Sequence, residues 1–183
     1  MSITLATPRD RLISLSRAMT WLTTGGIGLI TILTLVGVAV PDWTRNIALA
    51  KLGAAAAALP ITPLGQLLAG VVLAVPVGVM LYGLFAARRM FQAFARGEVF
   101  SSNTAHQLQI FAATVMLQSP LGPLTSAGLS AALSVGNPPS QRAIMIAFST
   151  NDYFALVVGG VLFAAATLMR EGARIAEENA GFV

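Results

Sequence analysis

LGQLLAGVVLAVPVGVMLYGLFAA, residues 64–87, contains no charged side chain, and Arg88 and Arg89 follow it directly. A helix of this length, rising ~1.5 Å per residue, covers the ~30 Å hydrocarbon core of a bilayer. Pro63 stands at the first turn, where a missing N–H is harmless, and Pro76 is expected to kink the helix in mid-membrane. The stretch therefore predicts a transmembrane helix.

Three more hydrophobic blocks lie on either side of this stretch, over residues 18–40, 106–135 and 153–169. The chain of 183 residues is 56% hydrophobic and only 10% charged, with a mean hydropathy of +0.78. Soluble domains carry about a quarter of charged residues. We therefore expect an all-α integral membrane protein with one domain over 1–183. Its four transmembrane helices would form a bundle, with the second and third helices kinked.

The basic residues are unevenly divided between the two sides of this predicted arrangement. Loops that stay in the cytoplasm carry an excess of Lys and Arg. One side holds Arg9, Arg11, Arg17, Arg88, Arg89, Arg96, Arg170 and Arg174, and the other holds Arg45, Lys51 and Arg142. Both termini, a turn at 88–105 and a tail at 170–183 are thus predicted to be cytoplasmic, and an even number of spans agrees with this.

The two outer loops are expected to contain little regular structure. The first, residues 44–63, is apolar and rich in alanine but carries two basic residues, so a short interfacial helix is predicted there. The second holds Asn137, Arg142 and Asp152, with an apolar segment at 143–148 that fits either an interfacial strand or a helix.

The chain offers little chemistry of the kind that enzymes and ion-coupled transporters need. It has no cysteine and one histidine, which leaves too few ligands for a metal or haem site. The parts of the predicted spans that lie in the hydrocarbon core hold no ionisable side chain, although proton relays and ion pathways normally require one. We expect no catalytic, cofactor-binding or metal site, and an enzyme is the weakest of the functional hypotheses.

A proline-rich break in the third span is the candidate intramembrane site. Interrupted helices at mid-membrane often form binding sites, because unwound carbonyls and helix ends face a cavity. The alternative is a kink whose freed backbone groups bond to neighbouring Ser and Thr side chains. The candidate residues are Gln118, Ser119, Pro120, Gly122 and Pro123. Small residues after the break, and glycines in the outer spans, predict close helix packing at Ser126, Ser130, Ser134, Gly25, Gly26, Gly28, Gly159 and Gly160.

The predicted cytoplasmic turn and tail form the second candidate site, a contact surface for a protein. Gly97 is expected to cap the preceding helix in the left-handed conformation, and the run Ser101-Ser102-Asn103 to supply the side-chain oxygen that caps the next one. Basic residues of the turn face acidic residues of the tail, so ion pairs between the two are predicted. The surface consists of Arg88, Arg89, Arg96, Gly97, Glu98, Phe100, Asn103, Glu171, Glu177, Glu178 and Asn179.

Two motifs of this surface resemble the bacterial family known as domain of unknown function 2975. The matching residues are Phe94, Arg96 to Ser101, Asn103, Arg170 to Gly172, Ile175, Glu177 to Asn179, Phe182 and Val183. The resemblance implies a small four-span protein of the bacterial cytoplasmic membrane. Members of that family often pair with small helix-turn-helix regulators, which implies a cytoplasmic protein as a partner.

The leading functional hypothesis is a non-enzymatic membrane protein that acts through protein contacts, as an accessory subunit or a membrane-side sensor or regulator. The alternative is a small permease or small-molecule binder that uses the broken third helix. The expected partners are the lipid bilayer and a protein, either a membrane complex or a cytoplasmic regulator. Self-association is a further option, and nucleic acid is not expected as a partner.

Overall fold

The computed structural model describes residues 8–53, 62–98, 101–138, 142 and 144–180, but not the side chains at 8–11, 176–177 and 179–180. Its five helices are α1 (Pro8–Ala39), α2 (Pro41–Leu52), α3 (Pro63–Ala95), α4 (Ser102–Ser134) and α5 (Thr150–Ala180). These ranges contain no strand, which confirms the all-helical prediction. The short helix expected in the first outer loop is α2.

Local signals in the sequence account for the helix ends around the turn between α3 and α4. Gly97 has φ +87°, and the N–H of Glu98 donates to the Ala93 carbonyl at 3.0 Å, a Schellman cap. Ser101 Oγ then accepts the N–H of Thr104 at 3.2 Å and starts α4. Both capping predictions are confirmed.

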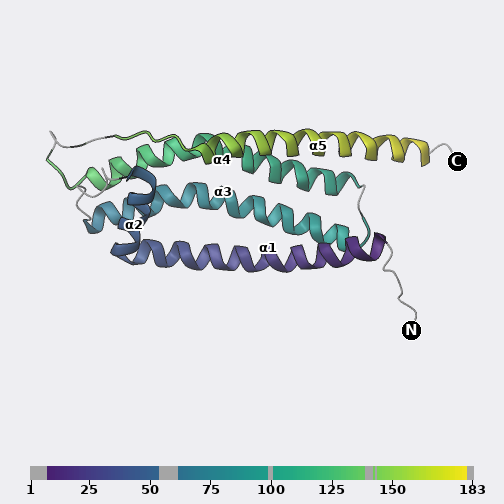
Figure 1. The fold of residues 1–183 in the computed structure, drawn as a ribbon, viewed down its shortest axis with the longest axis horizontal. Helices are drawn as coiled ribbons and strands as arrows, with labels where there is room; N and C mark the ends of the chain where they lie inside the picture. The colour runs from purple at the N-terminus through teal and green to yellow at the C-terminus, as the bar shows by residue number, and fades with distance from the viewer. Residues whose placement is uncertain (1–7, 54–61, 99–100, 139–141, 143, 181–183) are drawn as a thin grey trace.

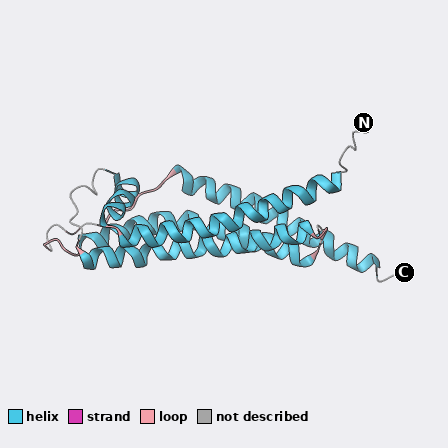
Figure 2. Cartoon of the chain, turned by 90° about the horizontal axis from the view of Figure 1, so that it is seen from below, coloured by secondary structure: helices cyan, strands magenta, loops and turns pink. Residues whose placement is uncertain are grey.

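The four long helices lie side by side in chain order (Figure 1). The extensive contacts between them are those of α1 with α3, α3 with α4, and α4 with α5. The four helices of the predicted bundle are arranged as an open row, with α1 at one edge and α5 at the other. Successive long helices run in opposite directions, so both ends of the described chain lie at the same end of the row (Figures 1 and 2).

The short helix α2 lies crosswise at the other end of the row (Figure 1). Its Ala48 is buried and belongs to the main apolar core with Ala69, Leu129, Ala132 and Leu133. A side-chain hydrogen bond also joins the end of α1 to α3: Gln66 Nε2 of α3 donates to the Val38 carbonyl of α1 at 2.7 Å. This end of the molecule is therefore held by packing among α1, α2, α3 and α4.

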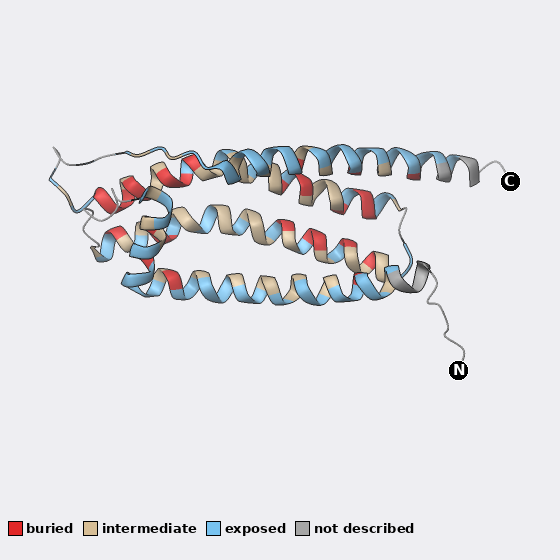
Figure 3. Cartoon of the chain, in the orientation of Figure 1, coloured by how far each residue is buried: buried red, intermediate tan, exposed pale blue. Residues whose placement is uncertain are grey.

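In the part of the chain that the structure describes, three helices contain a segment long and apolar enough to cross a membrane: α1 over Leu12–Ala39, α3 over its whole length, and α5 over Thr150–Ile175. Helix α4 is as long as α3 but more polar, with two prolines inside it. It lies between α3 and α5 and holds many of the buried positions, whereas α1 and α5 are exposed along most of their length (Figure 3).

The structure corrects the prediction of a broken third helix. Helix α4 runs without interruption through Pro120 and Pro123. Hydroxyl groups bond to carbonyls of this stretch, with Thr125 Oγ1 donating to Leu121 at 2.6 Å and Ser126 Oγ donating to Pro123 at 2.8 Å. Each proline leaves the carbonyl four residues earlier, that of Met116 or Ser119, without its helical donor, so these two hydroxyl bonds do not replace the missing backbone bonds.

The second outer loop is also shorter than predicted, because α5 begins at Thr150 and includes Asp152. The apolar segment before it, described from residue 144, is neither strand nor helix. At its other end α5 continues through the predicted tail to Ala180. The charged tail is thus the last part of the same helix that contains the predicted fourth span.

The glycines that allow close helix packing are not mainly the predicted ones. A Cβ at Gly25, Gly26, Gly28 or Gly160 would meet no atom within 4 Å. Packing of these four between subunits stays a prediction, but the prediction of close packing within the monomer is wrong for them. It holds for Gly159, which lies against Met116 and Ala112 of α4. Close approaches that the sequence did not single out occur at Gly65, Gly70, Gly83 and Gly128.

Candidate functional site

The predicted contact surface lies at the end of the row where the described chain begins and ends. Four of its charged side chains, those of Arg96, Glu98, Glu171 and Glu178, pair within their own segments. Arg96 of the turn bonds to Glu98 at 3.3 Å. Arg174 of α5 pairs with Glu171 and, at 3.4 Å, with Glu178.

The expected ion pairs between the turn and the tail do not form among the described side chains, so that prediction is wrong for them. Arg88 and Arg89 belong to α3, while α5 packs against α4. The Nε of Arg88 is buried without a hydrogen-bond partner, Arg89 is exposed, and Asn103 is exposed at the start of α4. Phe100 and the side chains of Glu177 and Asn179 lie outside the described part of the chain.

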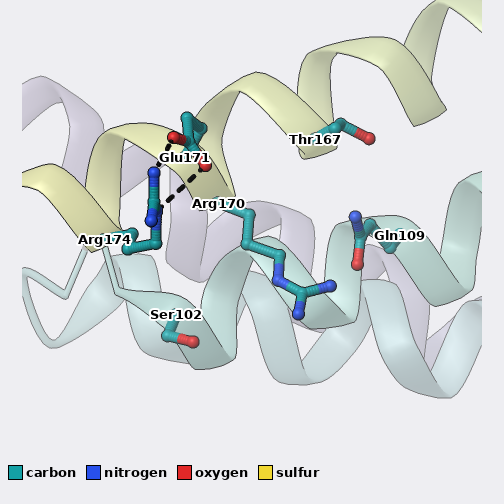
Figure 4. Close-up of a pocket in the computed structure, with 6 residues that line it drawn as sticks. All are labelled: Ser102, Gln109, Thr167, Arg170, Glu171 and Arg174. Carbon is teal, nitrogen blue, oxygen red and sulfur yellow. Dashed lines mark hydrogen bonds and ion pairs between the residues drawn. The ribbon is translucent and has the colours of Figure 1, made fainter.

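A cavity of about 430 Å³ opens between α4 and α5 at this end, lined by Ser102, Gln109, Thr167, Arg170, Glu171 and Arg174 (Figure 4). The side chain of Arg170 extends from α5 toward α4, on the side where Gln109 and Ser102 lie (Figure 4). No carboxylate among the described residues pairs with Arg170. The cavity therefore presents to a ligand the Arg170 guanidinium, the ion pair of Glu171 with Arg174, and the neutral hydrogen-bonding groups of Ser102, Gln109 and Thr167.

The neighbouring ion pair of Glu171 with Arg174 leaves the Arg170 guanidinium without a carboxylate partner among the described residues. A hydrogen bond from Arg174, together with its charge, lowers the pKa of Glu171 and raises the pKa of Arg174 itself. Glu171 is thus ionised at neutral pH and directed to Arg174. An acidic group of a ligand or partner protein can therefore pair with the Arg170 guanidinium.

The candidate intramembrane residues lie near the middle of the row and are only partly brought together. Gln118 Nε2 donates to the Pro76 carbonyl of α3 at 2.8 Å, and Gln118 and Gly122 line a cavity of about 330 Å³. Ser119 is half-buried, Pro120 is exposed and Pro123 is buried, and none of these three lines it.

Residues from the predicted outer loops complete this cavity. They are Lys51 from the end of α2, together with Asn151 and Asp152 from the first turn of α5. Sequence reasoning missed them because it assigned them to loops. A signal for part of this site is Ser149 followed by Asp152, the spacing of a helix capping box.

The capping box fixes the position of the Asp152 carboxylate. Its Oδ2 accepts the N–H of Ser149 at 2.8 Å, and Ser149 Oγ accepts the N–H of Asn151 at 3.2 Å. A Cβ at Gly122 would overlap the same carboxylate. Glycine at position 122 therefore makes room for Asp152 on the surface of α4.

Among the described residues, no three His, Asp or Glu side chains lie together in a way that could hold a metal ion. Comparisons of the chain with known protein families, with curated proteins and with solved structures found no match. The resemblance of the turn and tail to domain of unknown function 2975 thus stays a prediction.

Proposed function

We propose that the chain crosses the bacterial cytoplasmic membrane four times, with both termini in the cytoplasm. Three long helices are apolar enough to cross a membrane, and the more polar α4 lies between two of them. Burying α4 between α3 and α5 shields its Gln, Ser and Thr side chains from lipid. The alternating helix directions and the excess of arginine at the end with both termini support this orientation.

Single cysteines test this topology, because the natural chain has no cysteine. In intact cells a membrane-impermeant maleimide should label Pro138→Cys. Glu98→Cys and Gly172→Cys should react only after the membrane is opened. If α4 did not cross, residues 98 and 138 would be labelled from the same side, which would contradict the four-span proposal.

Our proposal for the activity is a non-enzymatic one, in which the protein acts through contacts at its cytoplasmic face as an accessory subunit, sensor or regulator. The observation that carries it is Arg170, which lines an open cavity without a carboxylate partner in the described structure. Beyond this cavity α5 continues to Ala180 with exposed charged side chains. An acidic segment of a partner protein fits this surface, and the family resemblance suggests a cytoplasmic regulator.

Two variants on the same face test this function. The chain would be purified in mild detergent from its native membrane, and co-purifying proteins would be identified by mass spectrometry. Arg170→Gln should reduce the recovery of the partner about tenfold or more, because a charge-assisted bond to a carboxylate is lost. Arg17→Gln, which changes an exposed arginine of α1 outside both the cavity and the predicted contact surface, is the matched control and should retain the partner. Equal recovery with both variants would contradict the role of Arg170.

The alternative function, a small permease or small-molecule binder, is favoured by one observation. The cavity at Gln118 and Gly122 contains charged side chains at a depth where a membrane protein normally has none. A lone purified protein that carries a bound small molecule would favour this alternative.

A further inference from the structure

The contacts between helices place Asp152 well inside the row along its length. Gly83 lies against Thr114, and Gly122 lies against Asp152, eight residues further along α4. Arg88 lies five residues beyond Gly83, on the side away from Asp152. The eight residues on α4 and these five on α3 together separate the level of Asp152 from that of Arg88 by about 20 Å, at ~1.5 Å per residue.

The other end of the row is about 15 Å away, because Gly65 lies against Ala132, ten residues beyond Gly122. Asp152 is therefore level with the charge-free stretch of α3 and not with either end. An ionised carboxylate at such a depth is costly unless a group of opposite charge or hydrogen-bond donors accompany it.

Lys51 is the opposite charge near this carboxylate, but the two side chains do not pair. Both line the cavity of about 330 Å³, and both line an adjoining cavity of about 510 Å³ between α2 and the start of α5. No ion pair joins Lys51 to any described carboxylate. The capping bond from Ser149 and the space above Gly122 keep Asp152 in place, so the carboxylate is held on α4 while Lys51 comes from α2.

Neutral hydrogen-bonding groups accompany the two charges. Gln118 and Thr125 line the smaller cavity, Ser126 and Ser149 line the larger one, and Asn151 lines both. The smaller cavity is otherwise apolar, with Leu73, Val77, Met80 and Leu121 in its wall. Apolar walls with a few convergent polar groups, in a volume of this size, are typical of small-molecule sites.

We propose that this cavity binds a small zwitterion, whose ammonium group pairs with Asp152 and whose anionic oxygens pair with Lys51. One such ligand pairs with both charges that line the cavity and adds no net charge to the site. Two sources share this chemistry: a free amino acid, and the phosphoethanolamine headgroup of a membrane lipid. The proposal goes beyond the contact function, because neither Lys51 nor Asp152 belongs to the cytoplasmic face.

Native mass spectrometry of the purified full-length chain in detergent tests the site with defined probes. The free zwitterion is L-leucine, compared with N-acetyl-leucine, which lacks the ammonium group, and leucinamide, which lacks the carboxylate. The lipid probe is short-chain phosphatidylethanolamine, compared with short-chain phosphatidylglycerol. At least one zwitterion should bind about tenfold or more tightly than its singly charged analogues.

Variants assign the binding to the two charges. Asp152→Asn keeps an acceptor for the capping bond and Lys51→Met keeps the chain length, and each should weaken binding about tenfold or more. The controls Asp42→Asn and Arg45→Met change exposed charges on the same helix as Lys51 and should bind like the natural chain. Circular dichroism of each variant establishes that its helices are intact.

Each outcome decides the proposal. Binding of L-leucine identifies a free zwitterion, and binding of phosphatidylethanolamine alone identifies the lipid headgroup. Absence of binding for both probes overturns the proposal, as does unchanged binding in folded Asp152→Asn and Lys51→Met. A loss of partner recovery in Arg170→Gln is independent of all these results, so the contact function and the zwitterion site fail separately.

Discussion

The backbone N–H of Met145 donates to Ser130 Oγ of α4 at 2.8 Å. Two residues on, the N–H of Ala147 donates to Ser126 Oγ at 2.9 Å. Two residues of extended chain span about 6.6 Å and four residues of helix about 6 Å, so the spacings match. Side chains between these contacts face outward, and Ile144, Ile146 and Phe148 are exposed. The small-residue face of α4 thus holds an extended segment in place of another helix.

Replacing Ser130 by alanine should destabilise the protein by about 1–3 kcal/mol, because the N–H of Met145 loses its acceptor. The free energy of unfolding in mixed micelles would measure the change. Ser134→Ala is the matched control, since among the described residues the Ser134 hydroxyl bonds only to the Ala131 carbonyl of its own helix. Equal losses of unfolding free energy in the two variants would show that the bond to Ser130 does not stabilise the extended segment.

Replacing Gly122 by alanine should cost about 1–3 kcal/mol of unfolding free energy, because the new Cβ would overlap the Asp152 carboxylate. Thermal unfolding of the purified protein would show the change as a lower Tm. Gly160→Ala in α5 serves as the control, because its Cβ meets no atom within 4 Å. That substitution should be neutral or stabilise α5 by up to about 1 kcal/mol. A Gly122→Ala protein as stable as the control would place Asp152 elsewhere.

Hydrophobic periodicity and caps predicted the long helices well, since these signals are local. The caps at Gly97 and Ser101 and the helix that begins at Pro63 follow directly from residue types. The open row was not predictable in this way, because every apolar helix face looks the same to a hydrophobic pattern, whether it meets lipid or another helix. Only specific contacts, such as Gly83 with Thr114, define the order.

The site residues were predictable only where sequence neighbours supply the chemistry. Gln118 and Gly122 were found through the prolines beside them, although the helix does not break there. Lys51 and Asp152 were not found, because each comes from a segment that looks like a loop. Their meeting with Gly122 depends on the crosswise packing of α2 and on the point where α5 begins. The start of α5 has a local signal, the capping box of Ser149 and Asp152, but the crosswise packing of α2 has none near these residues.

The pKa of Glu171 should lie below its ordinary value of 4.5, because Arg174 donates a hydrogen bond to its carboxylate and attracts its charge. Because the pKa is lower in the folded state than in the unfolded state, the ion pair stabilises the fold in full at pH values above the unfolded-state pKa. This stabilisation is lost as the pH falls through the lowered pKa. The carboxyl-carbon NMR shift of Glu171, followed during an acid titration, would report the pKa. In Arg174→Gln the midpoint should rise toward 4.5, and an unchanged midpoint would exclude the pair in solution.

The packing of α1 on α3 depends on Gly70, where an added Cβ would lie 2.7 Å from Cγ1 and 3.2 Å from Cγ2 of Val38. Gly70→Ala should therefore lower the free energy of unfolding by about 1–3 kcal/mol. The Cβ of Val38 would be 3.6 Å away, an ordinary contact, so removing its two methyl groups relieves the overlap.

A double-mutant cycle tests this relief. Val38→Ala alone should be mildly destabilising, and the double variant should be more stable than the sum of the two single changes by about 1–2 kcal/mol. Gly25→Ala on α1 is the control, because its added Cβ meets no atom within 4 Å and should not couple to Val38. Additive effects at Gly70 and Val38 would mean that α1 does not pack on α3 at this point. Since α1 has no other extensive contact with a long helix, its place at the edge of the row depends on the answer.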